Sequence, residues 1–279
     1  MKLYDFDGMF DEKLSEYVSK NAGKFKESEW EDIIPKLYKQ FGDTFIKSVG
    51  DTPNGFYAKM TDAELITALT THLKKDVPVS EFLCSAIESR NTAALLLPLL
   101  DGSENERSYA MNLIGADDRA IKKYMRLLTS ADSSADLKDA CVDFIKEKAD
   151  LVTDEAVKNY KEGIEREYML EILSRTVVRS DEIFEILLKE FRTDPENLPM
   201  HASYLAAYGD ERALGYLLEK IDEEGISFVE YRELKFAIEA LGGEYEKERD
   251  FSDDPYFELI KSHSQTSADV FGSFADKKN

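Results

Sequence analysis

The three histidines, His72, His201 and His263, are the side chains best suited to acid–base or metal chemistry, because histidine titrates between about pH 5 and 8. They stand far apart, and none belongs to a His-Glu-x-x-His or Cys-x-x-Cys spacing that would predict a zinc site. His72 lies seven residues after Leu65 on an apolar helical face, which favours a packed histidine over a ligand. His201 falls early in an expected helix, where it either packs inside or faces a partner.

Carboxylates are abundant but lack the spacing that calcium binding or acid–base catalysis needs. Residues 224–231 have the composition of the end of an EF-hand loop, yet no residue separates Gly225 from Ile226 where that loop has one. Residues 5–8 lack the downstream glutamate of a calcium loop and predict a turn. The acidic pairs at 117–118, 223–224 and 253–254 fall at helix starts or in loops, where carboxylates favour the helix dipole or face water.

Phosphate-binding and nucleophile motifs are missing as well. The glycines stand singly at helix ends, with no GxGxxG, no GxxxxGK[ST] and no Gly-x-Ser-x-Gly. Cys84 and Cys141 make no disulfide framework, and Cys141 lies on an apolar helical face. We therefore expect no catalytic residue, no cofactor and no metal, and a protein that is not an enzyme.

Charge narrows the choice of partner. The chain has 36 Lys and Arg against 57 Asp and Glu, a net charge of −21. Nucleic acids and anionic membranes are disfavoured, since both require clustered cations. A partner held by electrostatics should be basic, although the acidity alternatively serves as a solvated surface. The longest apolar stretch, 93–100, is interrupted by Pro98 and too short to span a bilayer, so we expect a cytoplasmic protein without a membrane partner.

A short sequence motif that occurs twice indicates which elements position these side chains. Residues 115–121 read Gly-Ala-Asp-Asp-Arg-Ala-Ile, and residues 209–214 read Gly-Asp-Glu-Arg-Ala-Leu. Each copy ends one apolar helical run with a glycine and begins the next, which predicts a joint between helix pairs. The residues of these joints, to which we assign a structural role, are Gly115, Asp117, Arg119, Gly209, Asp210 and Arg212.

Apolar residues at i, i+3, i+4 and i+7 predict five such helix pairs between about residues 91 and 243. In chain order the pairs are 92–100 with 103–114, 117–129 with 137–148, 154–161 with 166–176, 181–191 with 199–208, and 210–221 with 227–241. Ser103 with Glu106 and Ser227 with Glu230 have the spacing of capping boxes at two helix starts. The last pair predicts a core of Leu217, Leu218, Leu234, Ala237, Ile238 and Leu241.

The segment 209–242, and more loosely 107–117, resembles the HEAT-like repeats first noticed in the phycobilisome lyase group. Those repeats open with Gly-Asp-x-Arg-Ala and end with Ala-Leu-Gly, which fits residues 209–213 and 240–242. The mean period here is 31 residues, and the units beginning near residues 154 and 181 lack the Arg-Ala opening. The resemblance implies an all-α fold, a right-handed α-solenoid of stacked helix pairs, and a structural role for the opening Asp and Arg.

Residues 1–90 are also expected to be helical, as an N-terminal cap that is either a set of degenerate repeats or a separate domain. A capping box at Ser28 and Glu31 predicts a helix that contains Pro35, and a second box at Thr61 and Glu64 predicts another. Residues 50–55 predict a turn-rich connection. After residue 243 we expect an acidic linker, a short helix at 255–263 and a disordered tail from 264.

These patterns favour a non-catalytic scaffold that binds another protein or a peptide, possibly a basic one, on its curved face. The alternative is a HEAT-like enzyme or enzyme subunit, of the lyase type or similar to a DNA glycosylase. The missing catalytic motifs weigh against both forms, and the net charge of −21 weighs against the glycosylase form.

Overall fold

The computed structural model describes residues 2–259 and is all-helical there, with 69% helix and no strand. This confirms the expected all-α class, and it exceeds the ~30–35% helix of an average globular domain. One isolated antiparallel bridge joins Ile46 to Asp51. Within residues 2–259, no helix is both long and apolar enough to cross a membrane.

The chain divides into two compact units, residues 1–144 and residues 145–279, each with most of its contacts inside the unit. The first unit contains α1 (Phe6–Lys20), α2 (Glu27–Gly42), α3 (Pro53–Ala58), α4 (Asp62–Lys74), α5 (Glu81–Glu88), α6 (Ala93–Leu96), a 3-10 turn (Leu97–Asp101), α7 (Glu104–Ile114), α8 (Asp118–Leu128) and most of α9 (Ala135–Lys146). The second contains 3-10 turns at Ala149–Leu151 and Pro195–Asn197, α10 (Thr153–Glu162), α11 (Arg166–Arg175), α12 (Asp181–Thr193), α13 (Leu198–Tyr208), α14 (Ala213–Ile221) and α15 (Phe228–Ala240).

The five helix pairs expected from periodicity correspond to α6 through α15, and almost every boundary agrees within three residues. Both capping boxes are present, with Glu106 accepting from the Ser103 N–H at 2.9 Å and Glu230 from the Ser227 N–H at 2.7 Å. The first helix of the first pair departs from the expectation. It divides into α6 and a 3-10 turn that contains Pro98, because proline cannot donate the backbone hydrogen bond an α-helix requires.

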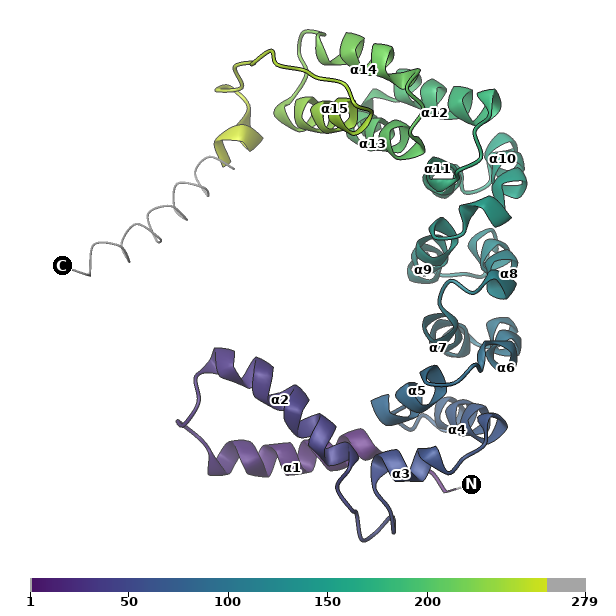
Figure 1. Ribbon diagram of the computed structural model, residues 1–279, viewed down its shortest axis with the longest axis vertical. Coiled ribbons are helices and arrows are strands. Elements are labelled where there is room, and N and C mark those ends of the chain that lie inside the picture. The colour runs from purple at the N-terminus through teal and green to yellow at the C-terminus, as the bar shows by residue number, and fades with distance from the viewer. Residues whose placement is uncertain (1, 260–279) are drawn as a thin grey trace, which may run out of the picture. The chain divides into compact units, whose positions relative to one another are not determined.

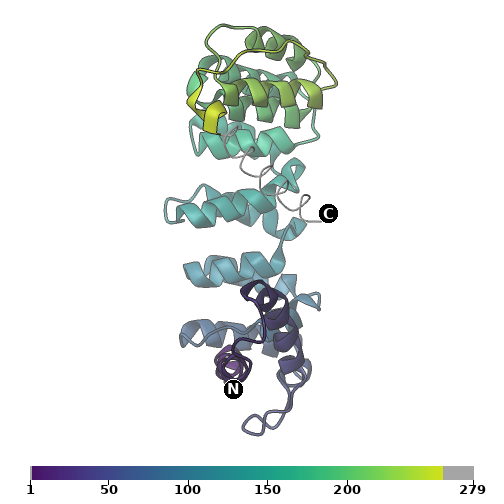
Figure 2. The same cartoon turned by 90° about the vertical axis from the view of Figure 1, so that its left-hand side faces the viewer.

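In the second unit the helices pack as neighbouring pairs. α10 packs on α11, α12 on α13 and α14 on α15, while α13 also lies against α11 and α15. In Figure 1, α11, α13 and α15 form one row of this unit and α10, α12 and α14 another. Figure 2 shows the same helices turned by 90° about the vertical axis. We call α11, α13 and α15 the second-helix row.

The core predicted for the last pair is largely confirmed. Four of its residues are at most 2% exposed: Leu217, Leu234, Ala237 and Ile238. Leu218 and Leu241 are half-buried instead. The apolar faces of α14 and α15 thus pack against each other, and Leu218 and Leu241 lie at the edge of this contact.

The core of the first unit is dominated by aromatic side chains. Phe6 is fully buried and its ring centroid lies 5.7 Å from that of Tyr57 and 6.4 Å from that of Phe82, both edge to face. Tyr38 stacks on Phe82 with centroids 4.6 Å apart. These contacts join α1, α2, α3 and α5, because such rings offer a large apolar area for a small number of residues.

Three N-terminal expectations need correction. Asp5 accepts a hydrogen bond from the Gly8 N–H at 2.8 Å, so residues 5–8 begin α1 rather than form a turn. α2 begins at Glu27, where Glu29 accepts from the Lys26 N–H at 2.6 Å, so the box expected at residues 28 and 31 is wrong. Residues 53–55, expected to belong to the connection at 50–55, instead begin α3.

The segment after residue 243 packs back onto the last helix pair. Tyr245 is buried and donates to Asp222 at 2.7 Å, and Arg249 donates to the carbonyls of Ile221 and Glu223, where α14 ends. Arginine near a helix C-terminus satisfies carbonyls that have no partner in the helix. Residues 255–259 are helical, and the tail expected from residue 264 lies outside the described part of the chain.

Candidate functional site

The two joint motifs of the sequence form the same local structure, which we call the Asp-Arg clamp. In one copy Asp117 accepts from the backbone N–H of Arg119 at 3.0 Å, from its Nε at 2.8 Å and from its Nη2 at 2.7 Å. In the other copy Asp210 accepts from the same three atoms of Arg212 at 3.0, 2.9 and 2.7 Å. This geometry needs the planar guanidinium of arginine, which a lysine could not replace.

Glycine precedes each clamp for a conformational reason. Gly209 has φ 73° and ψ 28°, a left-handed cap that ends α13 directly before Asp210. Gly115 has φ 61° and ψ −150°, a region that is almost restricted to glycine. This more extended conformation accommodates Ala116, the additional residue between Gly115 and Asp117.

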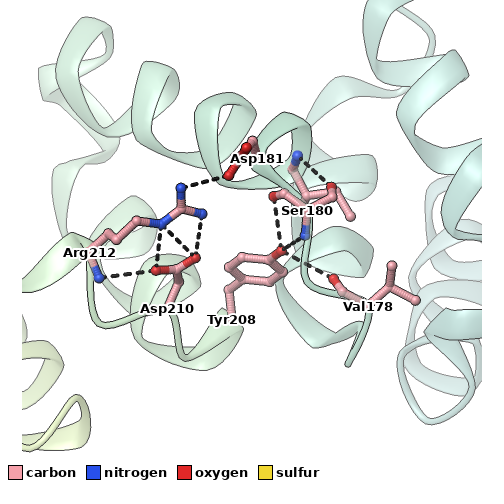
Figure 3. Close-up of polar contacts among 7 residues, drawn as sticks. Val178, Ser180, Asp181, Tyr208, Asp210 and Arg212 are labelled. Atoms are coloured by element: carbon pink, nitrogen blue, oxygen red, sulfur yellow. Dashed lines mark hydrogen bonds and ion pairs between the residues drawn. The ribbon is translucent and has the colours of Figure 1, made fainter.

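The clamp at Asp210 also joins two helix pairs. The Nη1 of Arg212 donates to Asp181 Oδ1 at 2.7 Å, and Asp181 is the first residue of α12 (Figure 3). The Arg212 guanidinium also lies 4.2 Å from the ring centroid of Phe184. Arg212 therefore links the start of α14 to the start of α12.

Tyr208 forms a second polar link beside this clamp (Figure 3). Its hydroxyl accepts from the Ser180 N–H at 2.9 Å and approaches the carbonyl oxygens of Val178 and Ser180 at 3.1 and 3.3 Å. Tyr208 is fully buried at the end of α13. The hydroxyl satisfies backbone groups of the irregular segment 176–180, which precedes α12. No sequence motif pointed to Tyr208, although it stands directly before Gly209.

The joint between α11 and α10 uses hydroxyl groups in place of the clamp. Asp150 accepts from the Thr176 hydroxyl at 2.6 Å and from the Val177 N–H at 2.8 Å. Thr176 also lies 3.0 Å from Thr153, oxygen to oxygen. Threonines at helix ends are too common in sequences for this network to have been predicted. Their arrangement ties the start of α10 to the end of α11 in a helix pair that lacks the Arg-Ala opening.

The structure places two of the three histidines inside. His201 is 3% exposed, and its Nε2 lies 3.0 Å from Asp194 Oδ2, so it packs at the start of α13 and has little surface for a partner. This corrects the expectation that His201 could face a partner. His72 is 1% exposed and its Nδ1 lies 2.8 Å from the Pro78 carbonyl. His263 lies outside the described residues.

Neither cysteine is poised for nucleophilic chemistry. Burial raises the pKa of Cys141 to about 12 and that of Cys84 to about 11, so both remain protonated thiols at neutral pH. Among residues 2–259 there is no group of three or more His, Cys, Asp or Glu side chains that could hold a metal ion.

The second-helix row carries carboxylates beside an aromatic ring. Burial and then the neighbouring carboxylates of Glu171 and Glu167 raise the pKa of Tyr204 to about 12. Tyr204 is half-buried on α13, while the two glutamates belong to α11. Glu171 pairs with Lys146 at 2.6 Å. We call Glu167, Glu171 and Tyr204 the acidic face. Arg175, near the same ring, acts in the opposite direction and lowers the pKa of Tyr204, so cations as well as carboxylates lie at the acidic face.

The joints predict a loss of stability in acid. Hydrogen bonds from Arg212 lower the pKa of Asp210, and those from Lys247 and Tyr245 lower the pKa of Asp222, each from 3.8. A carboxyl with a lowered pKa in the folded state contributes stability above about pH 3.8, and that contribution is lost as pH falls through the folded pKa. We expect urea midpoints to fall between pH 4 and pH 2.5, and to fall less steeply in Asp210→Asn. Equal midpoints at both pH values would contradict this.

Comparison with known proteins found no matching family model, no matching curated protein and no matching solved structure.

Proposed function

We propose that this protein is a non-catalytic scaffold of HEAT-like helix pairs that binds a basic protein segment. The observation that carries the proposal is the Asp-Arg clamp, which recurs with matching geometry at Asp117 and at Asp210. The same local geometry at the starts of two helix pairs supports a repeat protein, in which successive units are built alike. The finer architecture belongs to the same proposal: a right-handed α-solenoid whose end is covered by the N-terminal helices.

The proposed binding surface is the acidic face on the second-helix row. Helical repeat proteins use one extended row of helices as a binding surface. Glu167 gives this row negative charge, and Tyr204 offers a ring to a lysine or arginine side chain. Glu171 adds a carboxylate that Lys146 already pairs with. Residues 145–279 hold 32 acidic and 18 basic residues, a net charge of −14, so the surrounding field also attracts a basic segment.

The proposal predicts salt-sensitive binding of a cationic peptide. We expect a fluorescein-labelled peptide of alternating lysine and glycine to bind at 0.05 M salt and to weaken steadily toward 1 M, because the Debye length falls to ~3 Å there. Labelled duplex DNA should not bind at about 0.15 M salt, since phosphate contacts require clustered cations. Fluorescence anisotropy measures both. DNA binding at micromolar concentration would favour the glycosylase-like alternative and defeat this proposal.

A pair of double variants tests where the peptide binds. Replacing Glu167 and Glu171 by Gln should weaken binding by roughly 2–30-fold, because exposed ion pairs contribute ~0.2–1 kcal/mol each. Replacing Glu185 and Glu211 by Gln makes the same change in net charge on exposed positions outside the second-helix row and should have a smaller effect. Equal losses in both variants would show that the total charge, rather than the acidic face, holds the peptide.

A further inference from the structure

The α1–α2 hairpin leaves part of its apolar surface half-exposed, although Leu14 and Leu37 also touch the core of the first unit. No side chain from residue 11 through residue 40 is buried, although this stretch contains Leu14, Tyr17, Trp30 and Leu37. Trp30 packs against aromatic neighbours of the hairpin, with its ring centroid 6.3 Å from that of Tyr17 and 5.3 Å from that of Phe25. Two helices alone bury little, and most helical stability in proteins comes from packing of an apolar face.

Part of this surface is shaped as a groove between α1 and α2. The groove has a volume of about 180 Å³, and its lining is Phe10, Lys13, Leu14, Tyr17, Leu37, Gln40, Phe41 and Thr44. Small-molecule sites usually measure ~300–1,000 Å³, so this groove is better matched to one inserted side chain. Amphipathic helices bind apolar grooves in this way, with anchor residues at i, i+3 or i+4.

Lys13 gives the groove a positive charge in a strongly acidic chain. It is the only charged residue of the lining, and its Nζ lies 4.8 Å from the ring centroid of Phe41. Within residues 2–259, no carboxylate forms an ion pair with Lys13. Residues 6–42 hold eight acidic and six basic residues, a net charge of −2 out of −21, so a partner carboxylate meets little local repulsion here.

We propose that this groove binds an amphipathic helix of a partner protein, which inserts one apolar side chain between α1 and α2 and places a carboxylate against Lys13. A second copy of the chain is a poorer occupant, because two molecules of net charge −21 repel each other. This surface is separate from the acidic face, and its partner has the opposite charge preference. The two surfaces can therefore be tested independently.

The test uses two designed peptides as probes. Both are 18-residue alanine-based helices with the same leucines at i, i+3, i+4 and i+7, and they differ only in carrying glutamate or lysine beside the leucine face. Trp30 is the only tryptophan of the chain, so its emission reports binding at this hairpin. We expect both signals, Trp30 emission and peptide anisotropy, to change on binding, with the glutamate peptide about 2–5-fold tighter, as one exposed ion pair allows.

Variants of the groove make the assignment specific. Lys13 is exposed, so Lys13→Glu should leave the fold intact and reverse the preference toward the lysine peptide. Leu37→Ala should weaken both peptides by about tenfold or more, as loss of a buried apolar anchor does. Ile34→Ala is the matched control, because Ile34 is half-buried on the same helix but does not line the groove. Circular dichroism of each variant monitors folding.

Three results would overturn the proposal. If neither peptide bound at millimolar concentration, the groove would not accept a helix. An unchanged preference in Lys13→Glu would remove the proposed carboxylate contact. A dimer in light scattering that dissociates in Leu37→Ala but not in Ile34→Ala would assign the groove to a second copy instead.

Discussion

Ile238→Ala should lower the free energy of unfolding by about 2–5 kcal/mol, the usual result of truncating a buried isoleucine. Ile238 is fully buried on α15, the helix that packs against both α13 and α14. The variant loses the transfer free energy of the removed methyl and methylene groups and leaves a cavity among the helices. Urea unfolding followed by circular dichroism at pH 7 measures the change.

The matched control lies on the same helix. Phe236 is 56% exposed, so Phe236→Ala should change the free energy of unfolding by no more than about 0.5 kcal/mol, as surface substitutions usually do. A loss below that value for Ile238→Ala would place Ile238 outside the core. An equal loss for both variants would show that α15 does not have the buried and exposed faces described above.

Tyr208→Phe should destabilise the second unit by about 1–3 kcal/mol, although it removes a single oxygen atom. The variant keeps the buried ring but leaves the Ser180 N–H without its acceptor. The carbonyls of Val178 and Ser180 lose a polar neighbour as well. A buried donor without a partner costs the free energy of its desolvation, so the effect should exceed that of an exposed hydrogen bond.

Tyr216→Phe is the control for this change. Tyr216 is half-buried on α14, and the Arg192 guanidinium lies 5.6 Å from its ring centroid, a contact that the phenylalanine ring retains. We expect a change of less than about 0.5 kcal/mol. Equal effects of the two variants in denaturant melts would mean that the Tyr208 hydroxyl does not hold the joint.

The helix pairs could be predicted from the sequence because their signals are local. Apolar periodicity, the boxes at Ser103 and Ser227, and the glycines at 115 and 209 each depend on residues within a few positions of one another. The prediction was wrong at the start of α2, where two glutamates could each accept the capping hydrogen bond. At α2, Glu29 rather than Glu31 accepts the first backbone hydrogen bond, and the sequence contains a suitable serine for the later start only.

The joints could be predicted only in part. The Asp-Arg clamp spans three residues, so its repetition is visible in the sequence. Tyr208 and Thr176, by contrast, bond to groups 26–30 residues away. No local pattern identifies such partners. His201 illustrates the same limit, since only the packing at the start of α13 shows that its ring is buried against Asp194.

The polar links that hold the helices of the second unit together, two within a helix pair and one between pairs, have a consequence for synthesis on the ribosome. Thr153 and Thr176 are 23 residues apart, Ser180 and Tyr208 are 28 apart, and Asp181 and Arg212 are 31 apart. Each link therefore needs only the next ~30 residues of chain, which take about 2–6 s to appear at ~5–20 residues per second. Folds with such local contacts form rapidly. This unit can therefore fold pair by pair as it emerges, without waiting for its C-terminus.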